Sequence, residues 1–152
     1  MALICRYLRA VIFVLIVALV LSVAGGVFFR YALQQSLYWG TEVPNFLFVW
    51  IVFLGAVIAY HEKKHIAFTA LVELLQPRSR ALVEIFTLVM VLAFFAFLVI
   101  TGFMVVRQTM GSPSEALKIP LGLVYSCAPL ACVLMAIDTL DTLRDRLRTF
   151  PR

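Results

Sequence analysis

The sequence predicts an all-α integral membrane protein with four transmembrane helices. Of its 152 residues, 64% are apolar and 14% are charged, whereas an ordinary soluble domain has about 45–50% and about 25%. The apolar residues gather in four runs without Asp, Glu, Lys, Arg or His, at 10–29, 43–60, 85–106 and 119–137. The charged residues, with a net charge of +5, lie between and beside these runs. We therefore expect them to face a membrane surface, and we expect no nucleic-acid partner.

The four runs have the length that a membrane-spanning helix needs. They contain 20, 18, 22 and 19 residues, which corresponds to roughly 27 to 33 Å of helix and matches a hydrocarbon core of about 30 Å. No ten-residue alternation of apolar and polar residues occurs between turns. A bundle of helices is therefore expected in place of a β-barrel.

The basic residues are unequally distributed between the two sides of the predicted bundle. Ten lie before the first span, between the second and third, and after the fourth, while Arg30, Arg107 and Lys118 lie on the other side. Basic flanks stay in the cytoplasm, so both termini are predicted to be cytoplasmic. The outer connections, 30–42 and 107–118, have 13 and 12 residues and are too short to form a domain. Residues 1–152 are thus expected to form a single membrane domain.

The first span has an alternative interpretation as a secretory signal peptide. Arg6 and Arg9 precede its apolar run, and Ser22-Val23-Ala24 resembles a small-residue cleavage site. The run is longer than the ~7–15 residues of a signal core. Removing it would also upset the even number of spans that keeps both basic ends inside. We therefore expect this span to be retained.

Small residues form stripes on the first two spans. Ala18, Ser22 and Gly26 are spaced by four on the first span, and Gly55 and Ala59 repeat the pattern on the second. Such stripes let another helix approach closely. Packing of the first two spans on each other is the favoured explanation, and a partner protein seated on one stripe is the alternative.

The second span begins with residues suited to a helix start at the membrane surface. Thr41 is a plausible N-cap, Glu42 complements the positive end of the helix dipole, and Pro44 is tolerated in the first turn. Trp39 suits the headgroup level. The alternative is that Arg30, Trp39 and Glu42 contact a partner at the outer surface.

An interfacial helix is predicted after the second span, over residues 66–76. Phe68, Leu71, Val72 and Leu75 would share one face, and Pro77 would end the helix. Basic neighbours would draw this helix to anionic membrane lipids. In the fourth span, Pro120 lies at the beginning, and Pro129 is expected to kink the helix.

His61, Glu62 and His65 match the H-E-x-x-H pattern of zinc metalloproteases. In that pattern two imidazoles bind zinc, and the glutamate is the general base. The mechanism also needs a third ligand, and Pro77 interrupts the path to the nearest candidate, Glu84. Lys63 and Lys64 would place positive charge beside the metal. A membrane-embedded protease is therefore the alternative function, and we expect no metal site and no cofactor.

The spans contain no ionisable residue that could couple transport to an ion. Transporters usually keep such a group, or a broken helix, within the bilayer. If the chain belongs to a transporter, another subunit must handle the ions and the substrate. The residues thus favour an accessory or scaffold role over an enzyme.

Short motifs support this interpretation by their order and spacing. They are Phe28-Phe29-Arg30-Tyr31, Trp39-Gly40-Thr41-Glu42, Phe53-Leu54-Gly55-Ala56, His65-Ile66, Lys118-Ile119-Pro120-Leu121 and Pro129-Leu130. Over almost its whole length the chain resembles the small membrane (Q) subunit of tripartite ATP-independent periplasmic (TRAP) transporters. That family often has further acidic residues after the positions of Glu42 and Ile66, which this sequence lacks.

The resemblance implies a small permease subunit in the bacterial inner membrane. Its partners would be a large multispanning subunit, which carries the sodium and substrate sites, and a periplasmic substrate-binding protein. The small subunit would act as a scaffold in symport of organic acids. His65 would belong to a family motif unrelated to zinc.

Overall fold

The computed structural model describes residues 2–32, 34, 39–72 and 77–148. Within these residues, four long helices and one short helix follow one another. They are α1 (Ala2–Ala32), α2 (Glu42–Val72), α3 (Pro77–Thr109), α4 (Leu121–Tyr125) and α5 (Cys127–Arg148).

The prediction of an all-α, four-span membrane protein is confirmed. Among the described residues, four helical stretches are long and apolar enough to cross a membrane: Ile4–Ala32, Glu42–Glu62, Leu82–Thr109 and Leu121–Arg148. Each of the first three predicted spans lies within one of them. The fourth, predicted to begin at residue 119, begins at Leu121 and runs through α4 into α5. The helices extend beyond the charge-free runs because the polar residues that flank these runs also favour a helical conformation. After Pro44 no proline occurs until Pro77, so α2 can continue past its apolar run.

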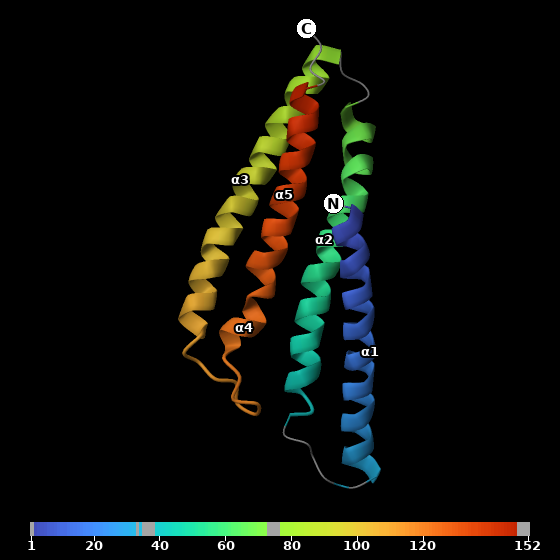
Figure 1. The fold of residues 1–152 in the computed structure, drawn as a ribbon, viewed down its shortest axis with the longest axis vertical. Coiled ribbons are helices and arrows are strands. Elements are labelled where there is room, and N and C mark those ends of the chain that lie inside the picture. Colours follow the sequence, from blue (N-terminus) through green and yellow to red (C-terminus); the bar gives the residue numbers. More distant parts are fainter. Residues whose placement is uncertain (1, 33, 35–38, 73–76, 149–152) are drawn as a thin grey trace.

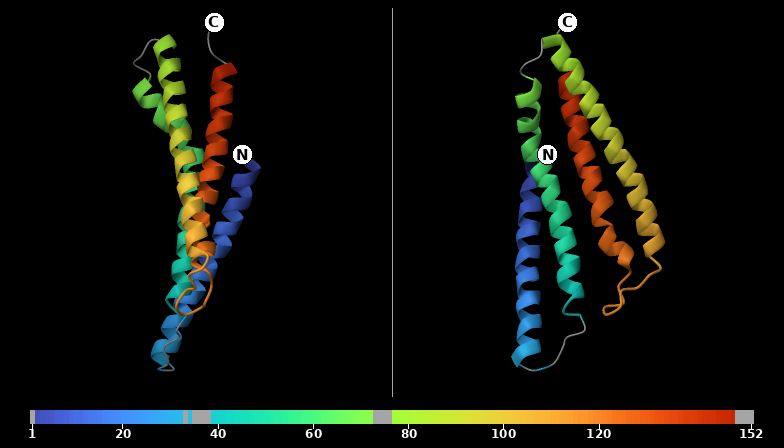
Figure 2. Two further views of the ribbon diagram at one scale, coloured as in Figure 1. Left: turned by 90° about the vertical axis from the view of Figure 1, so that its left-hand side faces the viewer. Right: turned by 180° about the vertical axis from the view of Figure 1, so that it is seen from behind.

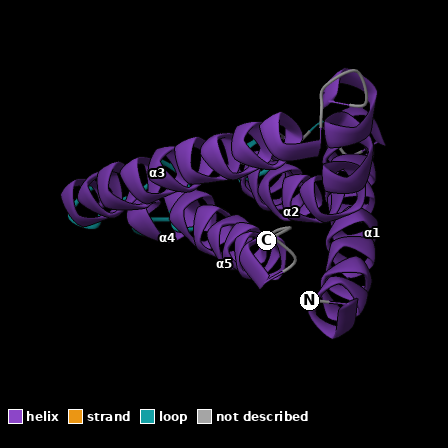
Figure 3. Ribbon diagram, turned by 90° about the horizontal axis from the view of Figure 1, so that it is seen from above, coloured by secondary structure: helices purple, strands orange, loops and turns teal. Residues whose placement is uncertain are grey.

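The helices run alternately up and down, and they form two pairs joined through α2 (Figure 1). α1 packs along α2, and α3 packs along α5. α2 also contacts α5, so it lies between α1 and the second pair (Figures 2 and 3). We call the end where α1 ends and α2 begins the loop end, because the connection from α3 to α4 lies there too. α5 ends at the opposite end, where α3 begins (Figure 1).

The predicted interfacial segment is not set off as a helix of its own. Residues 66–72 form the last turns of α2, and residues 73–76 lie outside the described residues. No proline or glycine stands between Tyr60 and Val72, so nothing in the sequence stops the helix at the end of the apolar run. A position of this segment in the membrane plane stays a prediction.

Pro129 causes a break in the fourth span, and this break lies about one turn before the proline itself. The helix breaks at Ser126, and Pro129 lies in the first turn of α5. A proline ring clashes with the carbonyl four residues before it, here that of Tyr125, and the break removes that conflict. Pro129 then packs on α3 at Gly102, where an added Cβ would lie 3.1 Å from the proline ring.

Most apolar side chains face outward. In the most apolar 18-residue stretch of α1, no residue is buried within the chain. The small core lies between α2, α3 and α5 and includes Leu54, Val57, Leu88, Phe95 and Cys127. The chain therefore buries few of its apolar residues by itself, and lipid or other protein must cover the rest.

Gly122 in α4 lies directly against the end of α3. A Cβ added there would come within 2.7 Å of the Val106 carbonyl oxygen and 3.0 Å of the Met110 nitrogen. Backbone atoms at these distances cannot turn aside as a flexible side chain could. The contact fixes α4 against α3 at the loop end.

Gly122→Ala is expected to destabilise the chain by about 1–3 kcal/mol because the added methyl group overpacks this contact. Gly55→Ala is the matched control, since nothing lies within 4 Å of its added Cβ, and it should be neutral or slightly stabilising. Thermal unfolding of the full chain in detergent, followed by size-exclusion chromatography, compares the two. Equal melting temperatures would contradict the tight approach of α4 to α3.

Candidate functional site

Hydrogen bonds between α2 and α5 form a polar cluster toward the end opposite the loops. The Tyr60 hydroxyl lies 2.9 Å from Oγ1 of Thr139, and Nδ1 of His61 lies 3.1 Å from both carboxylate oxygens of Asp138. Thr139 donates its own proton to the Met135 carbonyl, so Tyr60 is the donor to Thr139. We call these four residues, Tyr60, His61, Asp138 and Thr139, the α2–α5 clasp.

The clasp is sheltered from solvent on the α5 side. Asp138 is 2% exposed and Thr139 is 0% exposed, while the His61 side chain is 28% exposed. The Tyr60 ring meets Phe95 of α3 edge to face, with ring centroids 5.4 Å apart. A buried carboxylate without partners is costly, so the pairing of Asp138 with His61 fixes the register of α2 against α5.

A second contact joins α3 to the same end of α5. An Arg146 guanidinium nitrogen lies 3.3 Å from a Glu84 carboxylate oxygen. Glu84 is buried, whereas the Arg146 side chain is half exposed. Together with the clasp, this ion pair connects three of the four long helices.

The H-E-x-x-H residues do not come together with a third ligand. His61 turns Nδ1 toward Asp138, Glu62 is exposed, and the side chain of His65 lies outside the described residues. Among the residues that the structure describes, no group of three or more His, Cys, Asp or Glu side chains could hold a metal ion. His61 here is a structural partner of Asp138.

Glu42 anchors the connection between α3 and α4 at the loop end. Its carboxylate accepts hydrogen bonds from the backbone nitrogens of Ala116, at 2.8 Å, and Leu117, at 3.0 Å. The Ser114 side chain also hydrogen-bonds to it. The connection bends sharply, with Lys118 at φ 57°, a left-handed conformation that costs roughly 1–2 kcal/mol. The Glu42 carboxylate therefore holds a strained turn in place from α2.

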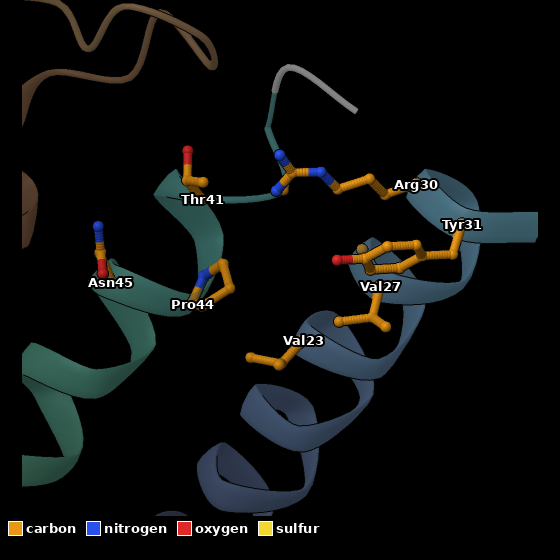
Figure 4. Close-up of a pocket in the computed structure, with 9 residues that line it drawn as sticks. Val23, Val27, Arg30, Tyr31, Thr41, Pro44 and Asn45 are labelled. Carbon is orange, nitrogen blue, oxygen red and sulfur yellow. The ribbon is translucent and has the colours of Figure 1, made fainter. Parts of the chain in front are cut away.

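An open cleft of about 440 Å³ separates the end of α1 from the start of α2. Val23, Val27 and Pro44 line its apolar part, and Arg30 and Tyr31 lie at its polar edge. Figure 4 shows the side chains of Arg30 and Tyr31 extending from α1 toward α2 across the cleft. The cleft lies at the same end as the Glu42 anchor.

The other predicted site residues lie on α1, on α2 and just before the start of α2. Ala18, Ser22 and Gly26 are half-buried, and an added Cβ at Gly26 would lie 3.7 Å from the Gly40 carbonyl oxygen. Gly55 faces open space and Ala59 is exposed. Arg30 is exposed, and Trp39 is half-buried beside the helix start. A role of these residues in contacts with another chain stays a prediction.

Comparison with known proteins identifies the family. Residues 6–149 match the DctQ component of tripartite ATP-independent periplasmic transporters. The chain belongs to this family. It is also 31% identical over 108 residues to a Haemophilus influenzae protein named as a TRAP transporter small permease protein, a match that covers 70% of this chain and 66% of that relative. The match thus spans just under two thirds of the relative's length.

The small permease family membership settles the general class of function. The chain is a multi-pass membrane component of a TRAP transporter and not an enzyme. The clasp, the Glu42 anchor and the cleft are therefore features of a transporter subunit.

The α2–α5 clasp is the feature that sequence reasoning missed. A usable signal was present, because Tyr60 ends the second charge-free run and His61 follows it, while Asp138 and Thr139 directly follow the fourth. Two spans that end on the same side of a membrane bring such residues to one level.

Glu42→Ala is expected to loosen the α3–α4 connection in this small permease subunit. Without the carboxylate, the amides of Ala116 and Leu117 lose their acceptors and should exchange hydrogen several-fold faster. Glu42→Gln, which keeps one acceptor oxygen, should fall between the wild type and Glu42→Ala. Hydrogen exchange followed by mass spectrometry measures this, and Glu62→Ala at the other end is the control. Unchanged protection in Glu42→Ala would contradict the anchor.

Asp138→Ala is expected to destabilise the packing of α2 on α5 by roughly 1–3 kcal/mol, because His61 loses its buried acceptor. Asp141→Ala is the matched control one turn further along α5, where the aspartate is exposed and should have little effect. Thermal unfolding of both variants in detergent tests this. The clasp would be refuted if Asp138→Ala melted at the wild-type temperature.

Proposed function

We propose that this chain is the scaffold subunit of a sodium-coupled, binding-protein-dependent secondary transporter that takes up organic acids. In this proposal a large multispanning subunit carries the sodium and substrate sites. A periplasmic substrate-binding protein delivers the substrate from outside. The proposal extends the family assignment, which by itself gives only the small permease class.

The scaffold role is supported by the contacts of the buried polar groups, which join helices of this chain to one another. The four charge-free runs contain no Asp, Glu, Lys, Arg or His, and the buried acids beside their ends, Asp138 and Glu84, face His61 and Arg146. An ion-coupling site usually needs an intramembrane carboxylate or a broken helix at mid-membrane. The break of the fourth span at Ser126 lies toward its loop end, after the short α4, and not at its middle. The polar groups of this chain hold its helices to one another, which supports placing transport chemistry in another subunit.

The outward-facing apolar surface supports a role beside a larger partner. No residue in the most apolar stretch of α1 is buried within the chain. Bulky side chains such as Phe13, Phe94 and Phe97 are exposed. A helix that is apolar on all sides is normally surrounded by lipid or protein. The half-buried stripe of Ala18, Ser22 and Gly26 and the open positions Gly55 and Ala59 are the proposed places of close helix approach.

We place the loop end at the periplasmic side of the bacterial inner membrane. Of the 13 basic residues only Arg30, Arg107 and Lys118 belong to that side, which agrees with cytoplasmic retention of basic flanks. The outer-face residues proposed to meet other TRAP components are Arg30, Trp39 and Glu42. Glu42 would act through the α3–α4 connection that its carboxylate anchors.

The function is tested by affinity purification of the tagged chain from its host in mild detergent. We expect a much larger hydrophobic protein to co-purify at about one copy per chain, and no zinc. In cells, Glu62→Gln should leave organic-acid uptake at the wild-type level, because the exposed Glu62 serves no proton transfer in this account. A lone chain with about one zinc bound, together with lost function in Glu62→Gln, would favour the protease alternative instead.

A further inference from the structure

The cleft between α1 and α2 joins an apolar wall to a single cationic edge. Val23 and Val27 face it from α1, and Pro44 faces it from α2 (Figure 4). The Arg30 guanidinium and the Tyr31 hydroxyl extend over its mouth. The volume of about 440 Å³ falls within the range of about 300–1,000 Å³ usual for small-molecule sites.

Among the described residues that line the cleft, Arg30 is the only charged one. Glu42 is the first acidic residue of the chain, so neither α1 nor the connection after it contains one. The Glu42 carboxylate is held by the backbone nitrogens of Ala116 and Leu117. Among the described residues, no ion pair or hydrogen bond of the Arg30 side chain is recorded. The cleft edge therefore carries net positive charge and favours an anion.

The cleft lies at the boundary between the apolar and polar parts of the membrane. Arg30 directly follows the charge-free run 10–29, and the run 43–60 begins beside Pro44. An arginine at this level reaches into the headgroup region while its stem stays along the apolar helix. A ligand with a phosphate at its polar end and hydrocarbon below it matches both parts of the cleft.

The glycine at position 26 contributes only backbone to the cleft wall. Gly26 lies on the cleft, and its missing side chain leaves the Gly40 carbonyl oxygen 3.7 Å from the Cβ position. A larger residue at 26 would fill the base of the cleft. The cleft wall thus combines this glycine with the two valines of α1 and with Pro44 in the first turn of α2.

We propose that this cleft binds one phospholipid of the membrane leaflet at the loop end. The lipid phosphate accepts hydrogen bonds from the Arg30 guanidinium, and one acyl chain lies along Val23 and Val27. Because the edge carries one cation and no anion, an anionic lipid such as phosphatidylglycerol binds more tightly than a zwitterionic one. The bound lipid fills the gap between the ends of α1 and α2.

Native mass spectrometry of the full chain, in the complex with which it purifies, tests this assignment. After delipidation, phosphatidylglycerol is titrated into the wild type, Arg30→Gln and Arg107→Gln. Arg107 is the matched control, since it also lies exposed in the last turn of a helix at the loop end but outside the cleft. We expect about fivefold weaker binding in Arg30→Gln and wild-type binding in Arg107→Gln, with Arg30→Lys retaining part of the affinity.

A second variant and two soluble anions separate a lipid from other occupants. Val27→Trp fills the apolar wall and should reduce lipid binding while Arg30 stays intact. Inorganic phosphate and succinate, each at the lipid concentration, should not displace the lipid. Equal losses in Arg30→Gln and Arg107→Gln would overturn the proposal. So would displacement by inorganic phosphate or succinate with no effect of Val27→Trp, which would indicate a site for a dissolved anion.

Discussion

The contact of α2 with α5 is the constraint on which the rest of the fold depends. α1 packs on α2, and α3 packs on α5, so the two pairs are joined chiefly where α2 meets α5. Apolar side chains alone specify such a contact poorly in lipid, because hydrocarbon outside the bundle is as favourable as hydrocarbon within it. The clasp of Tyr60, His61, Asp138 and Thr139 supplies the directional bonds that select one register.

The Glu42 anchor complements this contact at the other end of α2. There the carboxylate binds backbone nitrogens of the α3–α4 connection, and Gly122 lets α4 press against the end of α3. α2 is thus tied to the second helix pair near both of its membrane boundaries. Such a two-point attachment produces a stiff unit, which is the property a scaffold subunit needs if a neighbouring subunit moves during transport.

The sequence was sufficient for the helices but not for their contacts. Length and hydrophobicity determine where a chain crosses the membrane, so four spans could be predicted from charge-free runs alone. The ends of helices were harder, because the polar residues after Tyr60 continue α2, and because Pro129 moves the break in the fourth span to Ser126. The pairing of His61 with Asp138 joins residues 77 positions apart, and no local periodicity encodes it. The same holds for the bond from Ala116 to Glu42, across 74 positions.

If this subunit is a scaffold, the distance between α2 and α5 must stay constant while the transporter works. This distance can be measured directly. Spin labels at exposed positions Val52 of α2 and Leu130 of α5, in a complex otherwise free of reactive cysteines, report that distance by pulsed electron paramagnetic resonance. We predict the same distance distribution with and without sodium and substrate. A shift of about 5 Å, the rise of one helical turn, would contradict the account and show that this subunit itself rearranges during transport.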